Sequence, residues 1–334
     1  MYSLSTLKQL AKLVNDYWIS ENPEVGDCSW RRGSYMIGNM AAYELTGEQT
    51  YLSYALDWAN ENGWRFYNDT DYTTTNADYQ ICGQTYLKLH ELGYGTDEHM
   101  RKSMQHILND PACDYWWWID AVYMALPYFY QMGVKYQDER YFDKGYRLFV
   151  NIKEERTCYD TGEHLWYRDE RFLPDKQREP NGEKIFWSRG NGWLFGGLAR
   201  TLAVLPEESK YYAKYLQVFS DMAERLKALM NREGYYTCSL LDPQDWPMPE
   251  TSGTALFTLG YLTGFRLGIL DQSYLQTAMK CFDWLTYTAL NKSGRIGYTQ
   301  GVAWGPNTNI EQESSYDYVV GTYLLILQEL AQLF

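Results

Sequence analysis

The sequence predicts an all-α protein, an (α/α)6 six-hairpin barrel built from residues 1–334 as a single domain. Apolar residues recur at helical spacing along most of the chain, as at Tyr51, Tyr54, Ala55 and Trp58. The resulting helices alternate between an amphipathic kind and a kind that is apolar on more sides. This alternation is typical of six helical hairpins, in which one helix of each hairpin faces solvent and the other lines a common axis.

Twelve helices follow from the periodicity. We expect them, with ends defined to about 2–4 residues, at residues 3–20, 33–46, 48–62, 76–93, 97–109, 117–132, 138–154, 188–204, 208–230, 251–267, 271–288 and 315–332. From the third onward, each odd-numbered helix follows a short connector with an acidic residue at its start, such as Glu48, Asp97 or Asp271. Acidic groups complement the helix dipole there, and the single apolar stripe predicts an outer ring.

Even-numbered helices contain small residues inside the helical pattern. Gly196 and Gly197 lie in one of them, and Gly253, Gly260 and Gly264 lie in another. Glycine in a helix costs about 1 kcal/mol relative to alanine, so close packing between helices is the expected reason for its use. These helices are predicted to form the inner ring.

The connectors from outer to inner helices are long, at about residues 63–75, 110–116, 155–187, 231–250 and 289–314. In such a barrel the inner helices run parallel, so these loops and the helix N-termini share one face. Long loops on a rigid scaffold usually carry function, which predicts the site there. Alternating sequence within the loops predicts short β-hairpins at 164–172, 234–240 and 294–302.

Composition narrows the class of ligand. The net charge of −13 argues against nucleic acid and anionic membranes as partners, and no apolar stretch is long enough to span a bilayer. The chain has 32 Tyr and 13 Trp, a surplus that suits a ligand able both to stack on rings and to accept hydrogen bonds, such as a sugar; aromatic core packing is the other explanation.

No metal or cofactor is expected. The four histidines show no metal-ligand spacing, the six cysteines form no Cys-x-x-Cys pair, and phosphate-loop, dinucleotide and nucleophile-elbow motifs are absent. The N-terminal residues show no signal peptide, so the cytoplasm is the expected compartment, and a monomer or dimer the expected state.

Two carboxylates are candidate catalytic groups. Asp120 follows Trp116, Trp117 and Trp118, and an apolar setting raises the pKa of a carboxyl, as a general acid requires. Asp78 lies at the start of another inner helix. Each could instead cap its helix or complement the dipole, so both explanations stand at this point.

Arg189 lies between Trp187 and Trp193 at the start of an inner helix, where a cation opposes the dipole. A role in binding explains its position. His164, in the third long loop, is a candidate substrate contact or a plain loop residue.

Two segments resemble the unsaturated glucuronyl and rhamnogalacturonyl hydrolases of glycoside hydrolase families 88 and 105, and family 105 more closely. They are Trp118-Ile119-Asp120-Ala121-Val122-Tyr123-Met124 and Trp187-Ser188-Arg189-Gly190-Asn191-Gly192-Trp193, supported by Glu250-Thr251-Ser252-Gly253-Thr254-Ala255 and Tyr298-Thr299-Gln300-Gly301-Val302. The resemblance follows nearly the whole chain in order.

The resemblance implies a bacterial barrel enzyme without metal that removes a 4,5-unsaturated uronic acid from oligosaccharides left by polysaccharide lyases, pectic rhamnogalacturonan above all. The reaction would be hydration of a vinyl ether. Asp120 would be the proton donor and Asp78 the second carboxylate.

The same resemblance implies a set of substrate-binding residues: Arg189 as the basic group of the site, together with Trp118, Trp187, Trp193, His164 and Tyr35.

Other functions stay open from the residues alone. The same barrel could hydrolyse unsaturated glucuronyl residues from another polysaccharide, or act as an inverting glycosidase on saturated sugars with Asp78 and Asp120 as its carboxyl pair. A sugar epimerase is disfavoured by the scarcity of histidine. A carbohydrate-binding protein without turnover is the alternative outside the enzymes, and the effect of Asp120→Asn would distinguish it.

Overall fold

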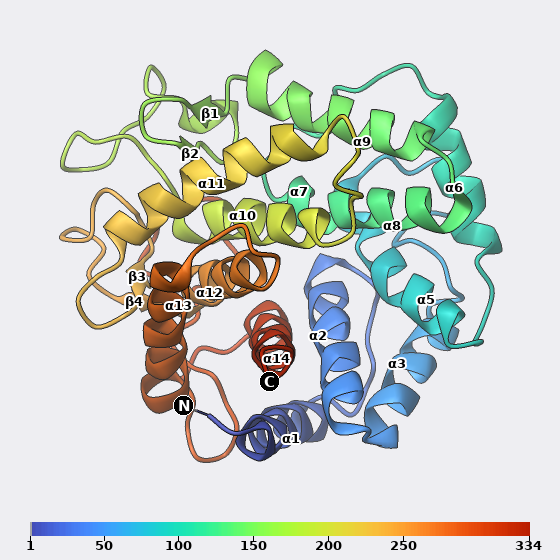
Figure 1. Cartoon of the computed structure of the whole chain (residues 1–334), viewed down its shortest axis with the longest axis horizontal. Helices are drawn as coiled ribbons and strands as arrows, with labels where there is room; N and C mark the ends of the chain where they lie inside the picture. Colours follow the sequence, from blue (N-terminus) through green and yellow to red (C-terminus); the bar gives the residue numbers. More distant parts are fainter. Residues whose placement is uncertain (1) are drawn as a thin grey trace.

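The computed structural model describes residues 2–334 and shows two concentric rings of helices (Figure 1). The outer ring comprises α1 (Leu4–Glu21), α3 (Gln49–Glu61), α6 (Glu98–Asn109), α9 (Arg140–Val150), α11 (Tyr212–Leu229) and α13 (Gln272–Trp284). The inner ring comprises α2 (Trp30–Thr46), α5 (Cys82–Glu91), α8 (Leu126–Tyr136), α10 (Ser188–Leu202), α12 (Thr251–Arg266) and α14 (Asp317–Ala331). This confirms the predicted all-α six-hairpin barrel, with the predicted helices alternating between the rings.

Two inner helices are interrupted where a single helix was expected. The segment predicted at 76–93 divides into α4 (Ala77–Gln80) and α5, and the segment predicted at 117–132 divides into α7 (Ala121–Met124) and α8. Pro127 lies in the first turn of α8, where its missing N–H and fixed φ suit a helix start but not a helix interior. The three consecutive tryptophans therefore precede α7 rather than forming its first turn.

The predicted hairpins were wrong in their ranges. β1 (Tyr159–Asp160) pairs with β2 (Leu165–Trp166), and β3 (Tyr236–Thr237) pairs with β4 (Pro249–Glu250). Strand β2 ends early, and the short helix η2 (Glu170–Phe172) takes up part of the range predicted as a hairpin. Asp169 caps η2 by accepting a hydrogen bond from the backbone N–H of Arg171. Residues 294–302 contribute only the isolated bridge between Ile296 and Leu290.

Glycine brings the inner helices into close contact. A Cβ at Gly38 of α2 would lie 2.1 Å from the carbonyl oxygen of Gly321 in α14, and one at Gly253 of α12 would lie 2.1 Å from Ser188 Oγ in α10. Gly197 is similarly tight against the backbone of Tyr123. The exception is Gly196, whose added Cβ would meet nothing nearer than 3.5 Å, so packing does not explain that residue.

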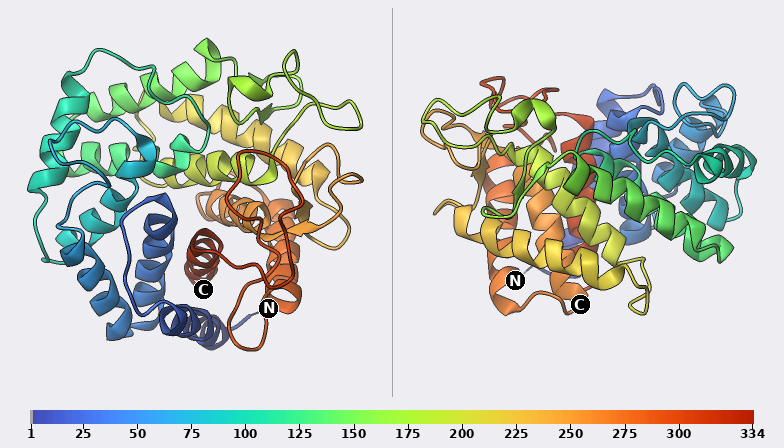
Figure 2. Two further views of the ribbon diagram at one scale, coloured as in Figure 1. Left: turned by 180° about the vertical axis from the view of Figure 1, so that it is seen from behind. Right: turned by 90° about the horizontal axis from the view of Figure 1, so that it is seen from above.

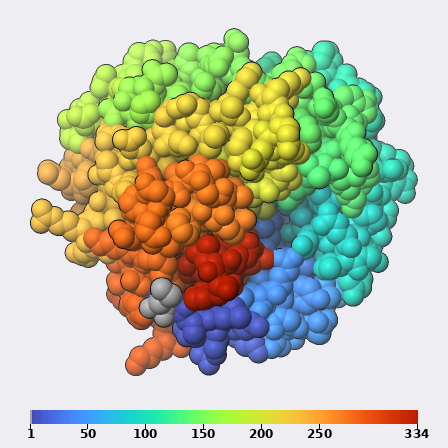
Figure 3. Space-filling view, viewed as in Figure 1, coloured from blue at the N-terminus to red at the C-terminus, as the bar shows by residue number. Residues whose placement is uncertain are grey.

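The long loops gather at one end of the barrel, at the N-termini of the inner helices, as the edge-on view in Figure 2 shows. Among residues 2–334, no helix combines the length and apolarity needed to cross a bilayer. The space-filling view shows the opposite end of the barrel, where the C-terminus lies (Figure 3).

Candidate active site

The N-termini of four inner-ring segments and two long loops enclose a cavity of about 70 Å³. Both predicted carboxylates and five tryptophans line it. The lining residues are Trp30, Asp78, Trp118, Asp120, Met124, Arg168, Trp187, Arg189, Trp193, Val302, Ala303 and Trp304. Six of the eight candidate residues, Asp78, Asp120, Arg189, Trp118, Trp187 and Trp193, therefore meet on the long-loop face, and their functional roles stay predictions.

Asp78 does not cap its helix. Asn76 does so instead, because its Oδ1 accepts a hydrogen bond of 2.9 Å from the backbone N–H of Asp78. The Asp78 carboxyl is thereby left for the cavity. Burial first, and then the neighbouring charge of Asp120, raise the pKa of Asp78 to about 7 against the opposing effect of Arg168.

Asp120 is also free of a capping role, although it directly precedes α7. The residue is 8% exposed, and its Oδ2 is buried without a hydrogen-bond partner. Burial raises the pKa of Asp120, while the positive charges of Arg168 and Arg189 work in the opposite direction. Burial thus favours the protonated form of both carboxyls, and at Asp78 the charge of Asp120 adds to this effect.

Arg168 is a site residue that the sequence analysis missed. Its Nε lies 3.4 Å from Asp120 Oδ2, a separation at which the two atoms form an ion pair without hydrogen-bond geometry. Asp169 fixes the guanidinium through a 2.7 Å contact to Nη1, and the ring of Trp117 lies 5.2 Å from it. The backbone of this loop is joined to the segment that carries Asp120 by the Ile119 N–H, which donates to the Arg168 carbonyl at 3.0 Å.

Arg189 lies at the cavity wall, but its guanidinium also holds a loop. It is 1% exposed and lies between the rings of Trp187 and Tyr318 at 4.6 and 4.9 Å. Its two Nη atoms donate to the carbonyls of Gln300 and Gly301 at 2.7 and 2.8 Å, and only Nε is left without a partner. Arg189 therefore anchors the segment that carries Val302 to Trp304 across the cavity.

Gln300 completes this anchor. Its Oε1 accepts from Trp187 Nε1 at 2.8 Å, and its Nε2 donates to the Gly305 carbonyl at 2.9 Å. The backbone N–H of Gln300 donates to Glu250, whose carboxylate also caps α12. The Gln300 side chain thus joins Trp187 to the loop that carries Val302 to Trp304.

Three of the aromatic residues predicted for the site lie at the cavity. Trp118, Trp187 and Trp193 all line the cavity, although their contact with substrate stays a prediction. Two further indoles were missed. Trp30 packs against Trp193 and Tyr318, and Trp304, which is 62% exposed, lies at the rim.

Two predicted contacts were wrong in position. Tyr35 is fully buried between α1 and α2, where its hydroxyl donates to Asn15 Oδ1 at 2.8 Å. His164 lies near the β1–β2 turn with its side chain 43% exposed, and its Nδ1 is 3.0 Å from the Tyr159 hydroxyl. Neither residue lines the cavity.

An α/α barrel that presents two carboxyls among indole rings on one loop-covered face is the arrangement expected of a carbohydrate-active enzyme. The chain belongs to glycosyl hydrolase family 88, whose model matches residues 5–334.

Individual relatives agree with this assignment. The unsaturated 3S-rhamnoglycuronyl hydrolase of Formosa agariphila is 28% identical over 321 residues, which cover 91% of this chain and 84% of that protein. A structure of a family 88 glycosyl hydrolase from Bacteroides vulgatus is 32% identical with a TM-score of 0.94, and all of both chains is covered.

A solved structure described as a polysaccharide lyase is 34% identical with a TM-score of 0.93, over 99% of this chain and 98% of that one. Structures of family 105 share the fold at 22% identity or less, with TM-scores of 0.75 to 0.79. The resemblance to families 88 and 105 is confirmed.

Proposed function

We propose that this enzyme removes a 4,5-unsaturated uronic acid from the non-reducing end of lyase-generated oligosaccharides, with Asp120 as proton donor. The observation that carries the proposal is the Asp120 carboxyl itself, which is buried among indole rings near a second carboxyl and has one oxygen without a hydrogen bond. The names of the curated relatives point to unsaturated uronides as the substrate class.

The chemistry is hydration of an enol ether. The Asp120 proton adds to C4 and the positive charge that develops at C5 is shared with the ring oxygen. Water then bonds to C5 and returns a proton to a carboxylate. The hemiketal opens as the bond between C5 and the ring oxygen breaks, and the exposed C1 hemiacetal releases the aglycone sugar. Asp78 positions the water, and the carboxylate that Asp120 becomes stabilises the positive charge.

Two arginines have separate tasks in this scheme. Arg168 orients Asp120 and stabilises the carboxylate that proton transfer leaves, because it forms the only ion pair that Asp120 makes among residues 2–334. Arg189 supplies positive charge toward the uronate carboxylate through its free Nε, while its other nitrogens hold the covering loop.

Replacing Arg168 with Met tests its task. The change removes the charge that lowers the pKa of Asp120, so we expect kcat to fall by about tenfold or more and the alkaline limb of the pH profile to move upward. Arg178→Met, at an exposed position of the same long loop, should leave both unchanged. A fall in kcat with no shift of the alkaline limb would contradict the electrostatic role.

The pH dependence has a defined sign. The catalytic carboxyl pair must hold one proton, and the pKa of Asp78 is about 7, so kcat/KM should decline as the pH rises through about 7. The same raised pKa opposes folding at higher pH, because the unfolded chain gives up this proton more readily. Asp78→Asn should therefore raise Tm at pH 8 while lowering activity. A flat profile between pH 6 and 8 would oppose this account.

As the specific substrate we propose oligosaccharides from pectic rhamnogalacturonan, in which an unsaturated galacturonyl residue precedes rhamnose. As the location of the enzyme we propose the bacterial cytoplasm. Chromatography of products from unsaturated galacturonyl-rhamnose and from unsaturated glucuronyl disaccharides tests the sugar preference. Faster release of rhamnose supports the pectic substrate. Faster cleavage of the glucuronyl series keeps the mechanism and reassigns the polysaccharide.

One relative favours a second candidate function. The 34% identical structure is described as a polysaccharide lyase, which points to elimination on a saturated uronide as the second candidate. Elimination creates the conjugated double bond that hydration consumes, so the sign of the ultraviolet absorbance change separates the two reactions.

A further inference from the structure

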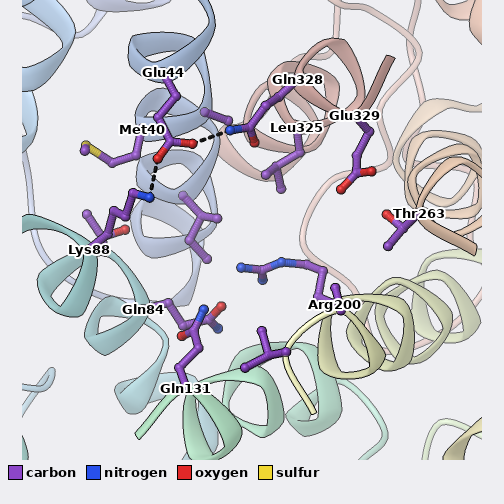
Figure 4. Close-up of a pocket in the computed structure, with 15 residues that line it drawn as sticks. Met40, Glu44, Gln84, Lys88, Gln131, Arg200, Thr263, Leu325, Gln328 and Glu329 are labelled. Atoms are coloured by element: carbon purple, nitrogen blue, oxygen red, sulfur yellow. Dashed lines mark hydrogen bonds and ion pairs between the residues drawn. The ribbon is translucent and has the colours of Figure 1, made fainter. Parts of the chain in front are cut away.

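A second cavity, of about 230 Å³, lies at the C-terminal ends of the inner helices, at the opposite end of the barrel from Asp120 (Figure 4). All six inner-ring helices contribute to it: α2, α5, α8, α10, α12 and α14. It shares no lining residue with the candidate active site. We call it the rear cavity.

Five polar atoms of the rear cavity are buried without hydrogen-bond partners: Gln84 Oε1, Thr85 Oγ1, Gln131 Oε1, Arg200 Nη1 and Thr263 Oγ1. Gln84, Thr85 and Thr263 are 4%, 1% and 1% exposed. Buried polar groups in folded proteins are normally paired, so five orphans around one cavity indicate a site built for a polar occupant.

The orientation of Gln84 is fixed by the backbone. Its Nε2 donates to the carbonyls of Tyr123 and Met124 at 3.2 and 2.9 Å, so its Oε1 is the atom left to accept. Figure 4 shows Arg200 reaching from α10 toward the centre of the cavity and Gln131 facing it from α8. The cavity therefore offers two amide oxygens that accept hydrogen bonds, a guanidinium that donates them, and two hydroxyl groups that can donate or accept.

Charge does not favour an ionic occupant. Glu44 pairs with Lys88, and Glu329 pairs with Arg266, so the acidic groups are already neutralised. Arg200 has no ion-pair partner among residues 2–334, which disfavours a cation. The inner helices end here and present the negative ends of their dipoles, which offsets the attraction of Arg200 for an anion.

We propose that the rear cavity binds a neutral polyhydroxylated molecule of monosaccharide size. Hydroxyl groups both donate and accept, so a molecule that carries several of them can satisfy the two amide oxygens and the guanidinium together. The volume is below the roughly 300–1,000 Å³ of pockets for drug-sized ligands, which limits the occupant to about one sugar ring. This inference is independent of the proposed reaction at the other end of the barrel.

The test is saturation-transfer NMR on the whole enzyme with D-glucose, D-galactose and L-rhamnose as probes and D-glucuronate as the charged comparator. At least one neutral sugar should bind, and glucuronate should bind more weakly. Arg200→Met and Thr263→Val should each weaken binding by about tenfold, the effect of losing one buried hydrogen bond or its charge-assisted form.

Matched controls locate the signal. Arg232→Met, at an exposed position, and Trp304→Ala, at the rim of the other cavity, should leave it unchanged. If Arg200→Met fails to fold, Thr263→Val decides. Binding that survives both rear-cavity variants, binding that is lost with Trp304→Ala, or soaked crystals that hold only ordered water between Arg200 and Thr263 would each overturn the proposal.

Discussion

Asp120→Asn is expected to lower kcat on an unsaturated uronide by about 10²–10⁴-fold while changing KM little. The amide keeps the size of the side chain but cannot deliver a proton to C4, and general acid catalysis contributes about that factor. The buried setting that raises the pKa of Asp120 makes the site dependent on this one proton. Steady-state kinetics on the purified variant measure the effect.

Asp175→Asn is the matched control, because Asp175 is an exposed carboxylate paired only with Lys176. It should retain wild-type kcat. An Asp120→Asn enzyme with more than about a tenth of wild-type activity would assign the proton donor elsewhere, and Asp78 would be the next candidate.

The second large effect concerns stability. Gly38→Ala places a methyl group 2.1 Å from the carbonyl oxygen of Gly321, an atom of the α14 backbone that cannot move aside alone. We expect the free energy of unfolding to fall by about 3 kcal/mol, the upper end of the usual cost of overpacking, because two inner helices must separate. Thermal or urea denaturation measures the change.

Gly196→Ala provides an internal contrast. The substitution is also buried and also lies in an inner helix, but its nearest neighbour would be Leu256 at 3.5 Å, which is ordinary contact. Alanine then gains up to about 1 kcal/mol of helix propensity. Equal destabilisation by both substitutions would show that the space between helices does not explain the glycines.

Local sequence patterns were enough to predict the fold and the face on which the two carboxylates lie. Helical periodicity and the two kinds of helix predict both rings, and the start of each inner helix predicts where Asp78, Asp120, Arg189 and Trp193 converge. These residues lie within a turn or so of a helix start, so the direction of the helix alone brings them to one face.

The positions of residues that are held by long-range contacts could not be predicted from local sequence. Arg168 reaches Asp120 because Ile119 binds its backbone and Asp169 holds its guanidinium, and a single sequence carries little sign of such pairing. Its one signal was the adjacent aromatic run, with Trp166 two residues earlier.

The errors in the site have a geometric reason. Trp30 and Tyr35 are five positions apart on α2, and at 3.6 residues per turn this separates their directions by about 140° around the helix. Trp30 faces the cavity, so Tyr35 points to α1. His164 adopts a positive φ of 54° near a turn, which directs it to the surface beside α11.

The central claim is that the enzyme hydrates a conjugated enol-carboxylate, and ultraviolet absorbance of that group tests it most directly. Purified enzyme added to unsaturated galacturonyl-rhamnose should abolish the absorbance, and Asp120→Asn should leave it in place. Absorbance that stays constant on every unsaturated uronide, or that rises when a saturated polyuronide is supplied, would contradict the hydration mechanism.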